Sequence, residues 1–247
     1  MKKSILTIAV LLFAFSSFSQ GGFYAGYENG GLFDKFQYVN DKGNTLWQTS
    51  IGGILGGYAG YKIEGYSVET GFYGLYPAVP FVDYNYNTGE VSKSNGMGSG
   101  DAYFMVPLRV GKEFLFAKGK LFVKPQVSFN TIYSPDYTKG KSSMGWGENL
   151  ELPGSLSHNT TGDSTIAKGY YTSFWNFALE TSIAAGYRIK KRIDIYIKWS
   201  YSAYFRPLYY ENITHYSGTG QTVYATRVNV NATLFQIGLN FYLKKQQ

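Results

Sequence analysis

The feature that most constrains this sequence is a strict alternation of apolar and polar side chains over unusually long stretches. In 193–206 every odd-numbered residue, from Ile193 to Phe205, is apolar, whereas the even-numbered residues include Asp194 and Arg206. Period-two alternation places the two sets on opposite faces of a β-strand. This stretch of fourteen residues is more than twice the usual strand length of about 5–6 residues. The chain is therefore expected to consist of long strands with two different faces.

Eight such strands are expected, joined by connections of alternating length. The expected strands are 22–28, 52–63, 66–76, 102–114, 120–133, 171–189, 193–206 and 228–243. The long connections are 29–51, 77–101, 134–170 and 207–222, and the short ones are 64–65, 116–119 and 190–191. This alternation predicts an all-β fold, an eight-stranded antiparallel up-and-down transmembrane β-barrel with long outer loops and short periplasmic turns. A secreted soluble β-sandwich or lectin-like fold is the alternative, because it produces the same alternation.

Composition favours the membrane interpretation. Aromatic residues make up 19% of the chain, and Tyr61, Tyr133 and Trp199 lie near expected strand ends, where interfacial aromatic girdles lie. Hydrophobic residues make up only 44%, and no segment after the N-terminus has 18 consecutive apolar residues, which excludes a helical membrane protein. The absence of cysteine excludes a disulfide scaffold, a cysteine metal site and a thiol nucleophile.

The N-terminus has the pattern of a secretory signal. Lys2 and Lys3 precede an apolar run, 5–15, and small residues follow at 17 and 19. We expect residues 1–19 to be a signal peptide, cleaved before Gln20, because the apolar run is too short to span a bilayer. Residues 20–247 then form a single barrel domain in the outer membrane, reached by export to the periplasm.

Some details fit the pattern poorly. Pro107 and Pro125 fall inside expected strands, where each removes a ladder hydrogen bond and indicates a bulge. The apolar parity changes within 228–243, which a bulge near Asn231 would repair. The first expected strand, 22–28, is short and weakly patterned.

The two faces of the strands predict two sets of residues. The residues expected to face lipid are Val123, Val127, Phe129, Phe177, Leu179, Ile195, Ile197, Trp199, Phe235, Ile237 and Leu239. The charged residues expected in the lumen are Glu28, Lys62, Glu69, Arg109, Glu113, Lys124, Glu180, Arg188, Asp194, Lys198 and Arg206. Eight strands leave an interior just wide enough for side chains, and buried charges need partners. The lumen is therefore expected to be closed by salt bridges.

Short motifs add a resemblance to a family. The chain resembles the outer-membrane β-barrel proteins of Bacteroidetes, often described as PorT-like, in the Ser-Phe-Ser-Gln end of the signal, in Tyr103–Leu108, and in the Gly-Tyr pairs Gly60-Tyr61 and Gly186-Tyr187. The resemblance implies a barrel over nearly all of 20–243. It also implies, among other roles, an accessory role in a protein secretion system.

Several functions remain open at this stage. The expected function is a structural or surface-interaction role, and the alternatives are a narrow ion or small-solute channel and a lipid A-modifying enzyme. His215, Ser217 and Glu211 have the spacing that one such enzyme family uses, but a chance match in a flexible loop is favoured. We expect no catalytic residue, metal, cofactor or nucleic-acid ligand. The expected partners are outer-membrane lipid, lipopolysaccharide and the barrel insertion machinery, and the barrel is expected to be a monomer.

Overall fold

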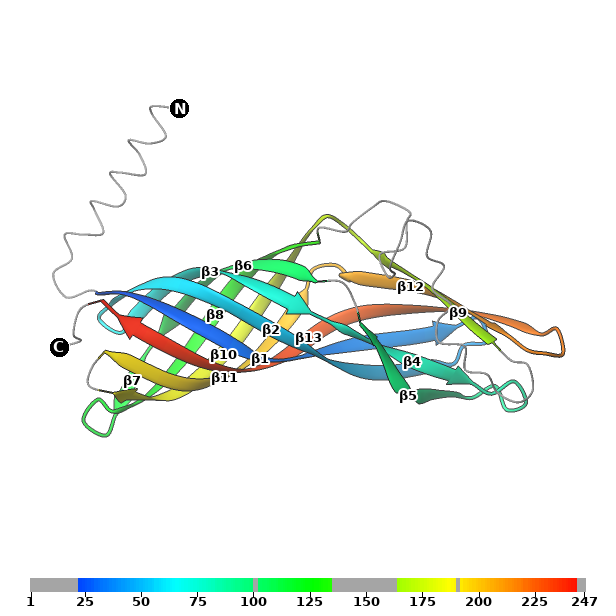
Figure 1. Cartoon of the computed structure of the whole chain (residues 1–247), viewed down its shortest axis with the longest axis horizontal. Helices are drawn as coiled ribbons and strands as arrows, with labels where there is room; N and C mark the ends of the chain where they lie inside the picture. Colours follow the sequence, from blue (N-terminus) through cyan, green and yellow to red (C-terminus); the bar gives the residue numbers. More distant parts are fainter. Residues whose placement is uncertain (1–21, 100–101, 135–163, 190–191, 244–247) are drawn as a thin grey trace, which may run out of the picture.

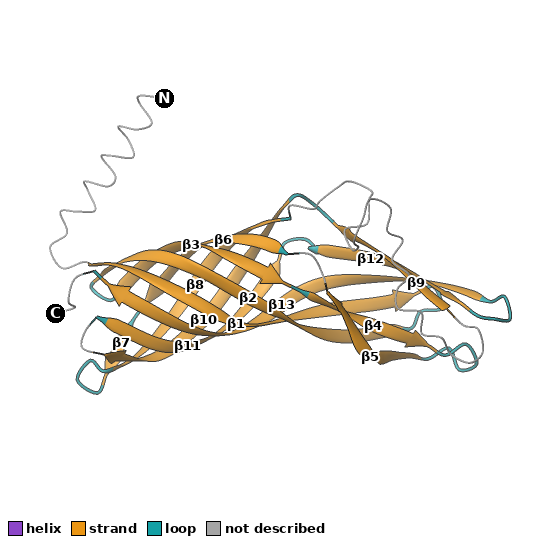
Figure 2. Cartoon of the chain, viewed as in Figure 1, coloured by secondary structure: helices purple, strands orange, loops and turns teal. Residues whose placement is uncertain are grey.

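The computed structural model describes residues 22–99, 102–134, 164–189 and 192–243. The expected signal peptide, the 190–191 turn and most of the 134–170 connection lie outside these residues. The described residues form an elongated molecule of strands joined by turns (Figures 1 and 2). Among them, no helix is long and apolar enough to cross a membrane.

Eight strands form a closed antiparallel ring. Neighbours in the ring follow chain order, and β1 closes the ring against β13 from Tyr24 opposite Tyr242 to Asn40 opposite Ala225. The ring strands are β1 (Gly22–Asn40), β2 (Thr45–Ile63), β3 (Tyr66–Tyr76), β6 (Tyr103–Lys112), β8 (Leu121–Tyr133), β10 (Trp175–Ile189), β11 (Ile193–Tyr204) and β13 (Thr222–Tyr242). The predicted eight-stranded up-and-down barrel is confirmed.

Tight turns gather at one end of the ring. Glu64 and Gly65 both have positive φ, at 49° and 83°, and Ile63 still pairs with Tyr66, as in a two-residue hairpin turn with two left-handed residues. The next short connection passes through 117–119, again with positive φ throughout. We call this the turn end. Both described ends of the chain lie there, where the amide of Leu243 donates to the carbonyl of Phe23 (Figure 1).

The opposite end of the ring, which we call the loop end, contains more strand structure than the sequence predicted. Only 41–44 separates β1 from β2, so the expected 29–51 loop and the short first strand were wrong. The reason is that Leu32, Asp34 and Phe36 share the buried face there. A buried face that mixes charged and apolar residues does not show as an alternation of hydropathy.

Further strands fill the other connections expected to be loops. β4 (Ala78–Tyr84) and β5 (Val91–Ser99) form a hairpin, β12 (Tyr209–Tyr216) pairs with β13, and β9 (Ser164–Tyr171) pairs with β12. With the loop-end parts of β1, β2 and β13 they form the extension, which continues the molecule beyond the ring (Figure 1). The extension has its own apolar cluster, built around Tyr38, Val82, Ile213 and Ala225.

The expected irregularities are only partly present. Neither Pro107 nor Pro125 causes a bulge, because the registers of β6 with β8 and of β8 with β10 pass through them without a shift. The bulge near Asn231 is present: Lys35 pairs with Asn231 but the next residue, Phe36, pairs with Asn229. The extra residue, Val230, reverses the parity of β13 at the boundary between barrel and extension. The short strand β7 (Phe114–Phe116) pairs with the start of β8 at the turn end.

Candidate functional site

The outer surface of the ring is apolar. Nine of the residues predicted to face lipid are exposed, and the other two, Val123 and Leu239, are half-buried on the same outward face. The charged side chains lie inside. This polarity is the reverse of that of a soluble protein, and the closed ring leaves no unpaired strand edge, which are the two conditions that a lipid bilayer imposes on a spanning sheet.

Ten of the eleven charged residues predicted in the lumen are buried in it. The exception is Arg206, which is exposed. β11 ends at Tyr204 and the chain bends away before Pro207, so the alternation that placed Arg206 inward no longer applies. The described lumen charges are then Glu28, Glu69, Glu113, Glu180 and Asp194 against Lys62, Arg109, Lys124, Arg188 and Lys198.

Glu28 is the centre of this network. Its carboxylate accepts hydrogen bonds from Lys198 Nζ at 2.7 Å and Arg109 Nη1 at 3.0 Å. Tyr73 and Tyr196 each donate to it at 2.8 Å, and Gln236 does so at 3.2 Å. These donors come from β3, β6, β11 and β13, so one carboxylate from β1 connects five of the eight ring strands.

A second anion lies beside the first. Glu69 on β3 accepts from Lys124 at 2.5 Å, from Tyr24 at 2.5 Å and from Gln126 at 3.0 Å. Arg109 Nη1 lies 3.9 Å from Glu69 and so connects it to the Glu28 centre. Side chains from β1, β3, β6 and β8 therefore meet at this level of the lumen.

A third group of charges lies toward the turn end. Arg188 pairs with Asp194 at 2.8 Å and with Glu113 at 3.0 Å, and Lys62 also pairs with Glu113. The hydroxyl of Tyr242 donates to Asp194 at 2.7 Å. Two cations and two anions therefore balance there without a solvent counterion.

Glu180 is the least satisfied anion of the lumen. It lies opposite Ser202 and accepts one hydrogen bond, from Asn130 at 2.8 Å. Its second oxygen has no hydrogen-bond partner in the described residues, and neither do two nitrogens of Arg109 or the hydroxyl of Ser200. This part of the lumen is polar, buried and incompletely paired.

Sequence reasoning missed the tyrosines of the lumen. Tyr24, Tyr58, Tyr73 and Tyr196 each lie directly opposite a glycine on the neighbouring strand. The glycines are Gly60, Gly26, Gly56 and Gly238, in the same order, and a Cβ at any of them would collide with the ring opposite. Inward glycine therefore provides the space that an inward tyrosine fills, as in the aromatic rescue of glycine. The signal was present in parity, because each tyrosine has the parity of the inward charge on its own strand, as Tyr73 has that of Glu69 on β3, but only the register pairs the tyrosines with glycines.

A polar cluster also lies within the extension, outside the membrane-spanning segments. His215 on β12 is fully buried, with Nε2 2.9 Å from the hydroxyl of Tyr38 and Nδ1 2.8 Å from that of Thr165. The ring of Tyr84, from the β4–β5 hairpin, stacks on it at 5.1 Å between centroids. Burial, with a smaller contribution from Arg227, lowers the pKa of His215 to about 4. The imidazole is therefore neutral at physiological pH.

The structure does not bring together a catalytic triad from the residues whose spacing suggested a lipid A-modifying enzyme, His215, Ser217 and Glu211. His215 lies on a strand rather than in a flexible loop, and both of its nitrogens already have partners. The hydroxyl of Ser217 pairs with Thr219 at 2.8 Å, and Glu211 pairs with Arg227. Within the described residues, no three histidine, aspartate or glutamate side chains are grouped as a metal site would require.

No family model and no curated protein sequence matches this chain. Among solved structures, a Neisserial surface protein, NspA, is similar with 11% identity and a TM-score of 0.43, over 89% of this chain and 96% of that one. The outer-membrane protein OprG of Pseudomonas aeruginosa has 10% identity and a TM-score of 0.44, over 90% and 96%. A major outer-membrane protein of Thermus thermophilus has 11% identity and a TM-score of 0.42, over 90% and 99%. The assignment of a transmembrane barrel depends on the strand ring and its polarity, not on these values.

Proposed function

We propose that this protein is a closed outer-membrane barrel that carries a folded extension at the cell surface, with a structural or surface-interaction role. The observation that carries the proposal is the Glu28 centre, where two cations, two tyrosines and a glutamine from four strands meet one carboxylate. Buried charges with this many partners are held in fixed positions. A lumen filled in this way supports a scaffold rather than a pore.

The extension supports the surface part of the proposal. It includes the loop-end parts of β1, β2 and β13, which are continuous strands shared with the ring, and the Tyr38 cluster gives it a core of its own. Arg227 pairs with Glu211 and donates to the carbonyl of Pro80, which ties the β4–β5 hairpin to β12 and β13. A rigid platform of this kind suits contact with lipopolysaccharide or with another protein.

The proposal also includes how the chain reaches the outer membrane and its oligomeric state in that membrane. The expected signal peptide would deliver the chain to the periplasm, and the insertion machinery would place it in the outer membrane as a monomer. The resemblance of Tyr103–Leu108, which lies on β6, to PorT-like barrels supports a more specific role as an accessory protein of a secretion system.

A narrow conduit is the second candidate function, and the environment of Glu180 favours it. The unpaired atoms of Glu180, Arg109 and Ser200 would be satisfied by internal water. Small side chains, among them Ser182, Ser202 and Ala232, surround this part of the wall. A chain of water there would carry protons or small ions if it continued past Glu28.

Conductance in planar bilayers distinguishes the two candidates. A closed barrel is expected to give no discrete openings, whereas Arg109→Ser, which removes one of the two arginine side chains from the lumen, is expected to give some. Lys35→Ser removes an exposed cation from the outer wall and serves as the control. Steady openings of the unmodified protein that change ion selectivity in Glu180→Gln would contradict the closed barrel and support the conduit.

A further inference from the structure

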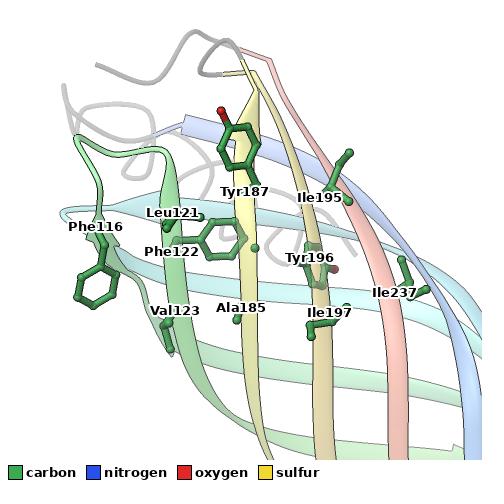
Figure 3. A pocket seen from close by; sticks show the side chains of 11 residues that line it. Phe116, Leu121, Phe122, Val123, Ala185, Tyr187, Ile195, Tyr196, Ile197 and Ile237 are labelled. Atoms are coloured by element: carbon green, nitrogen blue, oxygen red, sulfur yellow. The ribbon is translucent and has the colours of Figure 1, made fainter.

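The outward face of the molecule changes its chemistry between the ring and the extension. Near the turn end it consists of hydrocarbon side chains, as Val123, Ile197 and Ile237 show (Figure 3). In the extension, the outward positions of four neighbouring strands, β2, β1, β13 and β12, instead carry mainly aromatic rings, hydroxyls and amides. We call these twelve residues the extension face: Gln37, Val39, Thr45, Trp47, Tyr210, Asn212, Thr214, Tyr216, Thr222, Tyr224, Thr226 and Val228.

The extension face lies beyond the hydrocarbon core of the bilayer. A tilted strand crosses that core in about 9–11 residues. Tyr224 is seventeen residues from Phe241 of the turn end along β13, and Trp47 is fourteen residues from Tyr61 of the turn end along β2. The inward side of the same strands is covered by the β4–β5 hairpin, whose Val82 belongs to the Tyr38 cluster. In the proposed orientation, the extension face is therefore turned to the surroundings of the cell.

The extension face contains no charged residue. On an ordinary protein surface about a quarter to a third of the residues are charged, which would be about three or four of these twelve. Charged residues only border the face: Lys35 pairs with Thr49 on the side of the ring, Asp41 follows β1 at the tip, and Lys168 of β9 pairs with Asn212 at the edge. A face without charge does not attract phosphate or carboxylate groups, so it favours an uncharged ligand.

The exposed rings of the extension face lie beside groups that form hydrogen bonds. Three aromatic residues are directly opposite a hydroxyl or an amide side chain: Tyr224 opposite Thr214, Tyr216 opposite Thr222, and Trp47 opposite Gln37. The Cβ atoms of such pairs lie about 4.5–5.5 Å apart. The three rings are 62%, 41% and 47% exposed. A sugar ring has a face of C–H groups and a rim of hydroxyls, and each of these pairs offers an aromatic ring to the first and a polar group to the second.

We propose that the extension face binds uncharged sugars in the polysaccharide part of lipopolysaccharide. This inference deepens the proposed surface role and rests on the proposed orientation, which places the extension among these polysaccharide chains. A protein partner fits the face less well, because the core of a protein interface is apolar. On the extension face, Val39 lies between Thr45 and Thr226, so its apolar side chains are separated by polar ones.

Affinity electrophoresis of the full chain in detergent tests the proposal. The probe is the polysaccharide released by mild acid hydrolysis from the lipopolysaccharide of the bacterium that produces the protein, and alginate is the anionic comparison. The unmodified protein is expected to bind the first probe and not alginate, with an affinity that does not change with salt, because no charge on the face takes part. Tyr216→Ser/Tyr224→Ser is expected to weaken binding about tenfold. The matched control is Tyr66→Ser/Tyr187→Ser, which removes two exposed tyrosines at the turn end and is expected to bind normally.

The polar groups have a separate test that keeps the rings. Thr214→Val/Thr222→Val removes two hydroxyls from the extension face, retains β-branched side chains that suit a strand, and is expected to weaken binding about threefold. Each variant is checked for the gel mobility of a folded barrel.

Several results would overturn the proposal. These are no binding of the polysaccharide, equal binding by the two tyrosine double variants, and binding of alginate that is lost at high salt. Loss of a dimer in Tyr216→Ser/Tyr224→Ser, measured by analytical ultracentrifugation, would also overturn it, because the face would then join two copies of the chain. The binding test uses purified protein, so its failure leaves the closed barrel and its orientation to be decided by conductance and by labelling of intact cells.

Discussion

At the scale of single residues, the lumen is held by side chains that serve more than one partner. Arg109 reaches both Glu28 and Glu69, and Arg188 reaches both Glu113 and Asp194. Removing one member of such a set leaves a buried charge without compensation, which is more costly than removing a whole pair. Charged residues with the same predicted position in the lumen therefore differ in how much stability is lost when they are replaced.

Lys198 and Arg206 make this difference testable. Lys198 is fully buried and bonded to Glu28, whereas Arg206 is exposed beyond the end of β11. Lys198→Met is expected to lower the free energy of unfolding by about 3–5 kcal/mol, and Arg206→Met by less than about 0.5 kcal/mol. Urea unfolding in lipid vesicles measures both. Similar losses for the two variants would place Arg206 in the lumen after all.

His215 makes the extension sensitive to acid. Its folded pKa of about 4 lies below the value of about 6.5 expected in the unfolded chain, so the unfolded state binds more protons between these values. The stabilisation is complete above about pH 6.5, falls as the pH drops toward 4, and amounts to at most roughly 3 kcal/mol. Proteolysis of the extension is expected to accelerate from pH 7 to pH 4.5, and less so in His215→Gln. An identical acceleration in that variant would assign the effect to carboxylates instead.

At the scale of elements, each ring strand separates two environments by parity alone. On β11, Ile195, Ile197 and Trp199 are exposed to the outside, whereas Asp194, Lys198 and Ser200 are fully buried inside. The extension obeys the same parity but with buried faces of mixed polarity, and the Val230 bulge changes which parity faces inward. A strand such as β13 is therefore continuous even where its alternation of apolar and polar residues is interrupted.

Two substitutions on β11 compare its faces. Ile197→Arg places a charge in the lipid and is expected to destabilise the barrel by about 2–4 kcal/mol near the midplane. Ser200→Ala is expected to change little, because the hydroxyl of Ser200 has no partner in the described residues. Reversible unfolding in vesicles measures both variants. Equal effects would refute the assignment of the two faces.

At the scale of the whole molecule, the ring divides the chain into two ends with different tasks. The turn end holds both described chain ends, the tight turns and the charge group of Arg188, whereas the loop end is prolonged by the extension (Figure 1). In the proposed orientation the extension is outside the cell and the turns are periplasmic.

Epitope tags test this orientation. A tag after Glu90, in the turn of the β4–β5 hairpin, is expected to bind antibody on intact cells. A tag after Lys118, in the turn between β7 and β8, is expected to bind only after the outer membrane is permeabilised. Both sites are exposed and lie outside strands, so insertion alone is not expected to prevent folding. The opposite labelling would reverse the barrel in the membrane.

The sequence by itself determined the strand ring, because period-two alternation and connection length are local properties that survive in any register. Ten of the eleven charges predicted in the lumen are also buried, since parity alone decides whether Glu28 or Lys198 faces inward. Tertiary structure decided what those charges contact. The convergence of donors on Glu28 and the tyrosines opposite Gly26 and Gly238 depend on which residues the registers place side by side. The extension also required tertiary structure, because its strands bury charged and aromatic residues together, and only their contacts with one another distinguish them from loops.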